Sequence, residues 1–128
     1  MQRTMLKSKI HRARVTECDL HYVGSITIDE DLLQDADMLE HEQVHVVDVD
    51  NGARFVTYTL AGERGSGTMQ VNGAAARLVE RGDRIIVISY ADYDEADLAH
   101  YTPRVVHVDA ENGVVAVDKQ VDTLVGAR

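Results

Sequence analysis

Short segments in which apolar and polar residues alternate recur along the chain, and a period of two is typical of strands with one buried face. The pattern predicts strands at residues 2–16, 25–28, 44–49, 54–60, 85–89, 105–108 and 114–117. Segment 85–89 is apolar almost throughout, which predicts a strand buried on both faces. Asn-Gly pairs at 51–52 and 112–113 predict the turns of two hairpins.

Helical signals are few and short. Asp29 is a typical N-cap residue, followed by two acids that would stabilise the first turn. The apolar stripe of this helix would consist of Leu32, Leu33, Ala36 and Leu39. A short helix is also predicted up to residue 79, an acidic helix or turn at 92–99, and connections at 17–24 and 61–68. Because strands dominate without a strand–helix–strand rhythm, the sequence predicts a mainly β, closed, antiparallel or mixed β-barrel with short helices.

The length of 128 residues predicts one domain, which we assign to residues 1–118, with a flexible tail at 119–128. The net charge of −9 argues against a nucleic-acid partner. No apolar run approaches the roughly 20 residues of a membrane span, so no membrane partner is expected. The single cysteine, Cys18, suits a reducing compartment, and we expect a cytoplasmic protein with a buried or half-buried thiol.

Basic residues gather near the N-terminus. The first fourteen residues contain five Lys or Arg and no acid, whereas residues 15–53 contain eleven acids and no Lys or Arg. In a regular strand, Lys7, Lys9 and His11 would share one face. The cluster is either a solvated strand face or a local anion site on an acidic protein.

The Gly24-Ser25 bond is the main candidate for chemistry, although such pairs also occur in ordinary loops. Glycine permits strained backbone angles, and the serine hydroxyl could then attack the Gly24 carbonyl. His21 and Tyr22 are neighbouring candidates for moving the proton.

Two further stretches could hold a small anion. Arg54 suits a carboxylate, because a guanidinium donates two parallel hydrogen bonds. On a strand, Tyr58 would share its face and Thr57 would point the other way; a surface Arg and a structural Tyr are the alternative. Bare N–H groups at a helix start attract anions, although a plain Asn-Gly turn is the alternative there. The residues at that start are Asn72, Gly73, Ala74 and Ala75.

Residues 41–45 match the HExxH pattern of zinc proteases. That chemistry requires His41 and His45 on one helical face, but the second half of the pattern falls in a predicted strand. We therefore predict no metal site and interpret the stretch as a helix-to-strand connection. The segment 65–67, Gly-Ser-Gly, lacks the flanking residues of a P-loop or a nucleophile elbow and is predicted to be a flexible loop.

Together these motifs resemble those of the aspartate 1-decarboxylases, a pyruvoyl-dependent family, in order and spacing up to about residue 117. The matching stretches are Arg3-Thr4-Met5-Leu6, Lys9-Ile10-His11-Arg12, Asp19-Leu20-His21-Tyr22-Val23-Gly24-Ser25, Asn51-Gly52-Ala53-Arg54-Phe55-Val56-Thr57-Tyr58, Glu63-Arg64-Gly65-Ser66 and Val71-Asn72-Gly73-Ala74-Ala75-Ala76. The His-Glu pair at 41–42 and the tail after residue 118 match no motif of the family.

The resemblance implies decarboxylation of L-aspartate to β-alanine and CO₂ for pantothenate and coenzyme A synthesis. It implies a double-psi β-barrel and a homotetramer whose active sites lie between subunits. It also implies autocatalytic serinolysis between Gly24 and Ser25, which would leave chains 1–24 and 25–128 and a pyruvoyl cofactor formed from Ser25. A pyruvoyl decarboxylase of another amino acid and a non-enzymatic barrel that binds a small anion remain as alternatives.

The resemblance also implies roles for individual residues. Thr57 would donate to the oxyanion of the scission, and Tyr58 would return a proton to the substrate Cα. Arg54, helped by Lys9, would hold a substrate carboxylate. Further substrate contacts would come from the backbone N–H groups of Gly73, Ala74 and Ala75. The supporting residues would be His11, His21, Tyr22 and Asn72.

Overall fold

The computed structural model describes residues 1–119, so nearly all of the predicted tail at 119–128 lies outside the described residues. The strands are β1 (Arg3–Arg14), β2 (Glu17–Asp19), β3 (Ser25–Asp29), β4 (Gln43–Asp48), β5 (Arg54–Gly62), β6 (Met69–Asn72), β7 (Arg84–Tyr93), β8 (Arg104–Val108) and β9 (Val114–Asp118). The helices are α1 (Glu30–Asp35), the 3₁₀ helix η1 (Gly73–Arg77) and α2 (Glu95–Leu98). Among residues 1–119, no helix has the length and apolar character needed to cross a membrane.

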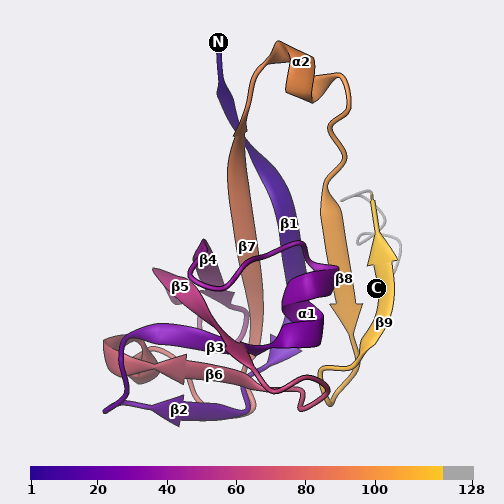
Figure 1. Cartoon of the computed structure of the whole chain (residues 1–128). Helices are drawn as coiled ribbons and strands as arrows, with labels where there is room; N and C mark the ends of the chain where they lie inside the picture. Colours follow the sequence, from indigo (N-terminus) through magenta and orange to yellow (C-terminus); the bar gives the residue numbers. More distant parts are fainter. Residues whose placement is uncertain (120–128) are drawn as a thin grey trace.

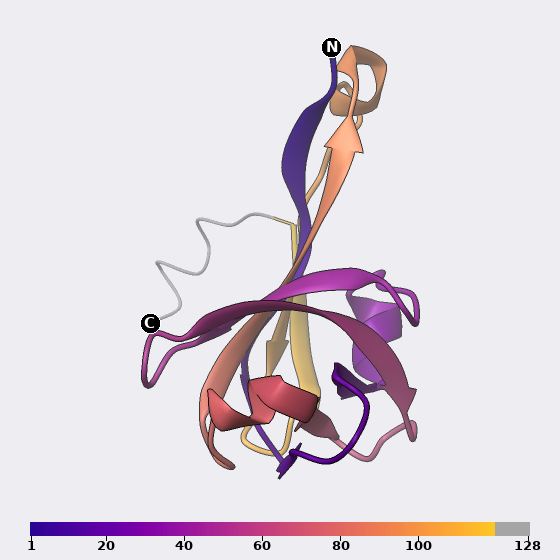
Figure 2. The same cartoon turned by 90° about the vertical axis from the view of Figure 1, so that its left-hand side faces the viewer.

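The strands of this described part form one mixed sheet in the order β2-β6-β3-β5-β4-β7-β1-β8-β9. The pairs β1–β8, β2–β6 and β3–β5 are parallel, and the other neighbours are antiparallel. Figure 1 shows β1, β7, β8 and β9 running up the molecule, while β2, β3 and β6 lie across its base. In the side view of Figure 2, the start of β1 and the end of β7 project together from the rest. The prediction of a mainly β chain with short helices is confirmed.

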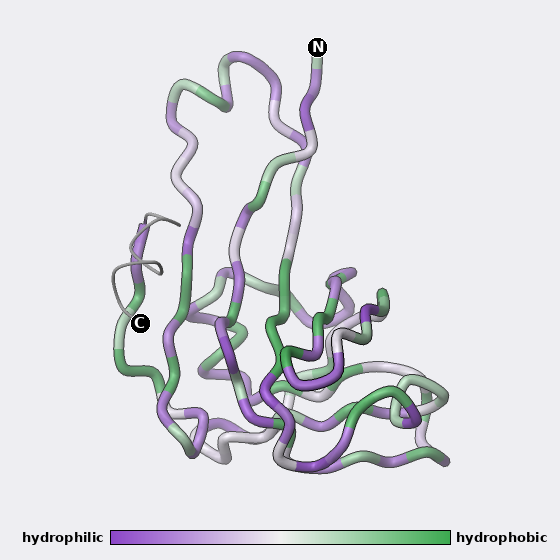
Figure 3. The backbone as a smooth tube through the Cα atoms, turned by 180° about the vertical axis from the view of Figure 1, so that it is seen from behind, coloured by the Kyte–Doolittle hydropathy of each residue, from purple (hydrophilic) through white to green (hydrophobic). Residues whose placement is uncertain are grey.

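The centre of the core lies on one face of the middle strands, as a period of two requires. Ile10 of β1 pairs with Val87 of β7, which pairs with Val46 of β4, and all three residues are fully buried. Figure 3 shows hydrophobic and hydrophilic stretches following one another along the strands. The prediction that segment 85–89 is buried on both faces is wrong, because Ile86 and Ile88 point to the other face and are only half-buried.

The start of α1 is held by Asp29, as predicted. The Asp29 carboxylate accepts the Asp31 backbone N–H at 2.8 Å. It also accepts the backbone N–H groups of Gly65 and Gly67 at 3.1 and 2.8 Å. The loop that the sequence predicts to be flexible is therefore fastened to the helix start.

Two local predictions are wrong. Leu39 is not part of a buried stripe but is 74% exposed, because α1 ends at Asp35 and Met38 takes the buried place instead. The predicted connection 17–24 contains the short strand β2, which has a parallel partner in β6. Such a short strand depends on its neighbour more than on its own sequence.

Both Asn-Gly turns join antiparallel strands as predicted, β4 to β5 and β8 to β9. In the second turn Asn112 is buried and has a φ of 64°, a left-handed conformation that asparagine tolerates. Its side chain accepts the Arg14 N–H at 2.8 Å and donates to the carbonyls of Arg14 and Gly67, both at 2.8 Å. The turn thus joins the end of β1 to the loop before β6.

Replacing Asn112 with alanine should lower the free energy of unfolding by about 2–4 kcal/mol, because one N–H and two carbonyls lose their partners in a buried junction. Denaturant titration measures this loss. Glu111→Ala, at the exposed neighbouring position, is the control and should change stability by less than about 0.5 kcal/mol. Equal losses in the two variants would contradict the bridging role of Asn112.

Candidate active site

Ser25 lies at the start of β3, directly opposite Asn72 at the end of β6. Both residues are buried, with exposed fractions of 1% and 0%. The Asn72 amide donates to Ser25 Oγ and to Thr27 Oγ1, both at 3.0 Å. Gln70 in turn donates to Asn72 Oδ1 at 2.7 Å, which fixes the orientation of the Asn72 amide. The strand pairing therefore gives the Ser25 hydroxyl a defined donor.

The conformational need for glycine lies at Gly73 rather than at Gly24. Gly73 has a φ of +75°, and a Cβ built there would lie 2.6 Å from Gly24 Cα and 3.0 Å from Gly24 N. A Cβ on Gly24 would meet no atom within 4 Å, and its φ lies outside the left-handed region. The left-handed strain that glycine permits is thus absent from the Gly24-Ser25 bond. The two backbones can touch only because Gly73 has no side chain.

The Ser25 hydroxyl points back along the chain and donates to the Val23 carbonyl at 2.8 Å. His21 and Tyr22 are both exposed, and within residues 1–119 neither side chain hydrogen bonds to Ser25. The His21 backbone N–H donates to Asp19 instead, at 3.1 Å. The structure therefore supplies an oriented hydroxyl but does not bring either predicted proton carrier onto it.

Strand β5 passes beside the start of β3. The first parallel pair is Ile26 with Thr59, so Thr57 and Tyr58 lie just beyond the point where β3 begins. The Tyr58 ring packs edge-to-face against His41, with ring centroids 6.3 Å apart. Sequence reasoning missed this contact, because it weighed His41 only as a zinc ligand.

Arg54, at the start of β5, lines a hollow of about 160 Å³ on the sheet face opposite the buried valines. His45, Val56, Ile88 and Tyr90 also line it, and the His45 and Tyr90 rings pack edge-to-face at 5.0 Å. This hollow combines one cationic group with apolar walls, which suits a small anion.

Lys9 points to the same face of the sheet as this hollow. It pairs with Ile88, which pairs with His45, which pairs with Val56. Burial lowers the pKa of Lys9. Three strand spacings separate Lys9 from β5, or about 14 Å between backbones, so the two cations could approach one ligand only by extending toward each other.

Within one chain, Arg54 and Ser25 do not meet. Extending the β3–β5 pairing by one residue brings Ser25 level with Tyr58, and Arg54 lies four residues further back along β5. At a rise of about 3.3 Å per residue, that separation is roughly 13 Å along the strand. The predicted site residues therefore form two groups, one around Ser25 and Asn72 and one around Arg54.

The 3₁₀ helix η1 begins immediately after Asn72, and no side chain caps it. The Asn72 amide is used on Ser25 and Thr27 instead. Ala74 is exposed and Ala75 is half-buried. The first N–H groups of η1 thus start next to the pair formed by Ser25 and Asn72.

The HExxH stretch is not a zinc site of the protease kind. His41 lies in a turn with a φ of 72°, whereas His45 lies on β4, so the two are not on one helical face. Glu42 pairs with Lys7 at 3.0 Å and accepts the Ser89 hydroxyl at 2.5 Å. Burial opposes ionisation of Glu42, but the hydrogen bonds from Ser89, the Leu39 N–H and Lys7 outweigh it, so its pKa is lowered.

His11 and Cys18 belong to neither group of predicted site residues. His11 is half-buried and packs edge-to-face on His107, with centroids 5.9 Å apart. Cys18 is half-buried as predicted, and burial raises the pKa of its thiol. A raised pKa keeps the thiol protonated, which does not suit a nucleophile.

Comparison with known families decides between the alternatives that the motifs leave open. The family model for aspartate decarboxylase matches residues 1–115. The chain belongs to the aspartate decarboxylase family. Members convert L-aspartate to β-alanine with loss of CO₂ and depend in general on a pyruvoyl group. The matched span contains every residue of both groups described above, so the geometry around Ser25 and Arg54 belongs to the part of the chain that defines an aspartate decarboxylase.

Gly73→Ala should destabilise the fold by about 2–4 kcal/mol, because the new Cβ would overlap the Gly24 backbone and because φ is left-handed. Gly24→Ala should change stability by no more than about 1 kcal/mol, since space is open there. Denaturant unfolding in a Ser25→Ala background, where the hydroxyl expected to cut the chain is missing, compares the two. Similar losses in both variants would show that the close approach at Gly73 is not a constraint.

Proposed function

We propose that this chain matures by cutting its own backbone between Gly24 and Ser25 and then decarboxylates L-aspartate with the pyruvoyl group so formed. The observation that carries the proposal is the buried Ser25 hydroxyl, which lies 2.8 Å from the Val23 carbonyl with the Asn72 amide on its oxygen. A hydroxyl held beside the adjoining peptide group needs little movement to reach the Gly24 carbonyl. The products would be chains 1–24 and 25–128.

The scission proceeds in three steps: ester formation, elimination and hydrolysis. Ser25 Oγ bonds to the Gly24 carbonyl carbon, the peptide C–N bond breaks, and the hydroxyl proton goes to the released nitrogen, giving an ester. Loss of a proton from the Ser25 Cα then breaks the Cβ–Oγ bond and leaves Gly24 with a free carboxylate. Water replaces the nitrogen of residue 25, which leaves as ammonia, and a keto group remains. Thr57, beside the start of β3, is our proposed donor to the transient oxyanion.

The surroundings of Ser25 suit a small carbonyl group at this position. The Asn72 amide is a neutral donor aimed at the Ser25 oxygen, and Gly73 presents bare backbone beside Gly24. When present, the pyruvoyl group supplies an electron-accepting carbonyl that takes up the electrons left at the substrate Cα as CO₂ departs. The chain itself has to bind, orient and protonate the substrate.

In this proposal, cationic side chains and backbone N–H groups bind the substrate. Arg54 clamps one carboxylate of L-aspartate, and Lys9 on the same sheet face adds attraction. The N–H groups of residues 73–75 bind the other end near Ser25, with His11, His21 and Tyr22 in support. Tyr58 returns a proton to Cα, and its packing on His41 holds the phenol in place.

The separation of about 13 Å between the two groups supports an active site shared by neighbouring subunits. Within one chain, Arg54 and L-aspartate would both have to be fully extended to span that separation, so we propose that Arg54 of one subunit serves Ser25 of the next. Val56 and Tyr90 beside Arg54 are 54% and 42% exposed, as an uncovered interface would be. We therefore propose a homotetramer of double-psi β-barrels that works in the cytoplasm.

Ser25→Ala should remain one uncut chain without decarboxylase activity, because it lacks the attacking hydroxyl. Tyr58→Phe should still cut itself but decarboxylate about 10²–10⁴-fold more slowly, since only the later proton transfer is lost. Denaturing intact mass reports the cut, and CO₂ release from aspartate reports turnover. An active Ser25→Ala chain would refute self-processing, and a Tyr58→Phe variant with full activity would remove Tyr58 from the mechanism.

Mixing two inactive variants tests whether subunits share the site. Arg54→Ala should be cut yet lose about 2–5 kcal/mol of transition-state binding, whereas Ser25→Ala keeps Arg54 but has no cofactor. Co-expression of the two should restore part of the activity, because some interfaces then combine an intact Arg54 with an intact pyruvoyl group. Each variant alone, and a subunit carrying both substitutions mixed with either, are the controls. Recovery no greater than in the controls would place both groups within one subunit.

A further inference from the structure

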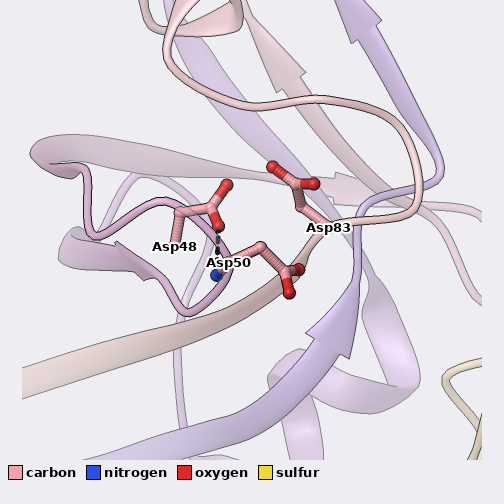
Figure 4. A group of neighbouring side chains, drawn as sticks. All are labelled: Asp48, Asp50 and Asp83. Carbon is pink, nitrogen blue, oxygen red and sulfur yellow. Dashed lines mark hydrogen bonds between the residues drawn. The ribbon is translucent and has the colours of Figure 1, made fainter.

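Three carboxylates outside the proposed active site converge at one end of the sheet. Asp48 ends β4, Asp50 lies in the following turn, and Asp83 directly precedes β7 (Figure 4). One oxygen from each lies within 4.8 Å of the others. The antiparallel pairing of β4 with β7, which sets Asp48 opposite Ile85, brings together residues more than thirty positions apart.

One oxygen of each carboxylate is committed to the backbone. Asp48 Oδ1 accepts the N–H groups of Asp50 and Asn51 at 2.8 and 3.2 Å. Asp50 Oδ2 accepts the Arg84 N–H at 2.8 Å, and Asp83 Oδ2 accepts the Glu80 N–H at 3.0 Å. These bonds fix the positions of the three side chains, and no N–H or hydroxyl group of residues 1–119 donates to the second oxygen of any of them.

The surroundings of Asp48 are unfavourable for a charged carboxylate. Asp48 is fully buried, and its Oδ2 atom has no hydrogen-bond partner in the described part of the chain. No Lys or Arg of residues 1–119 forms an ion pair with Asp48, Asp50 or Asp83. A buried, unpaired carboxylate is costly, and two more carboxylates beside it add to the cost. A positive partner would relieve this cost.

A proton or a metal ion can supply that charge. Burial and the neighbouring Asp83 carboxyl together raise the pKa of Asp48 to about 6, against the hydrogen bonds from the Asp50 and Asn51 N–H groups. A single proton can be shared by only two of the three carboxylates, whereas a cation can contact one oxygen of each.

We propose that Asp48, Asp50 and Asp83 bind a divalent cation of the size and hardness of Ca²⁺. Carboxylate oxygens are hard ligands, and the cluster offers neither nitrogen nor sulfur, which argues against zinc or copper. Calcium–oxygen bonds of about 2.3–2.6 Å allow opposed ligands up to roughly 5 Å apart, and the three oxygens lie within 4.8 Å of one another. Magnesium demands near-ideal octahedral geometry and gives up its waters reluctantly, so three carboxylates from separate turns suit calcium better. Asp50 is exposed, so water completes the coordination.

The cation would tie the β4–β5 turn to the start of β7. Arg54 follows Asp50 by four residues on that hairpin, so the tie would also steady the strand that carries the proposed substrate clamp. No catalytic step passes through the ion, and the proposal stands whether or not the chain cuts itself.

The experiment uses the full-length protein, stripped of metal with a chelator and returned to buffer at pH 7.5. Calorimetric titration with Ca²⁺ should give saturable binding with a Kd on the order of 10⁻⁴–10⁻³ M, and 5 mM Ca²⁺ should raise Tm by several degrees relative to NaCl of equal ionic strength. Mg²⁺ should bind more weakly.

Asp83→Asn should abolish both the binding and the Tm shift, whereas Glu95→Gln, which removes an exposed acid on α2, should retain them. Asp50→Asn replaces Asp83→Asn if that variant does not fold, as judged by circular dichroism without metal. The proposal is overturned if Ca²⁺ produces no shift, if Mg²⁺ binds more tightly, or if Glu95→Gln loses the shift equally. It is also overturned if the sole effect of Asp83→Asn is to raise the Tm of the metal-free protein while Ca²⁺ binding is unchanged. A proton shared between carboxyl groups would then explain the cluster.

Discussion

The contact on which the site depends is one between two stretches of bare backbone. Gly73 approaches Gly24 so closely that a single methyl group would lie 2.6 Å from the Gly24 Cα. That approach lets β3 begin opposite the end of β6, with Ser25 facing Asn72. The amide of Asn72 and the start of η1 then fall beside the same hydroxyl. The absence of a side chain at Gly73 thus allows the Ser25 hydroxyl, the Asn72 amide and the first N–H groups of η1 to lie side by side.

The same alternation of side chains serves stability on one face of the sheet and binding on the other. Ile10, Val87 and Val46 form a fully buried row, and the adjacent row of Lys9, Ile88 and His45 points away from it. The two rows alternate along the same strands. The hollow beside Arg54 is therefore lined by rigid strands rather than by loops. Rigid support of this kind keeps a charged clamp in a defined orientation.

Local chemistry explains what could be predicted from sequence. The Asn-Gly turns and the Asp29 cap each depend on a few adjacent residues, and the structure has them as predicted. Features that depend on distant partners were not predictable: β2 needs β6, and His41 meets Tyr58 only because residues 41–42 bond to β5. The motifs around residues 25 and 54 identified the family, but the separation of the two groups required the strand register.

The position of β1 has a consequence for a chain cut after Gly24. Strand β1 is paired with β7 on one side and β8 on the other. Fragment 1–24 would therefore supply an interior strand of the sheet rather than an edge strand. The two pieces would then be held without any covalent bond. Once denatured and diluted they would have to find each other by collision, so refolding would become a second-order process that depends on concentration. Maturation would thereby make recovery from unfolding slow wherever the protein is dilute.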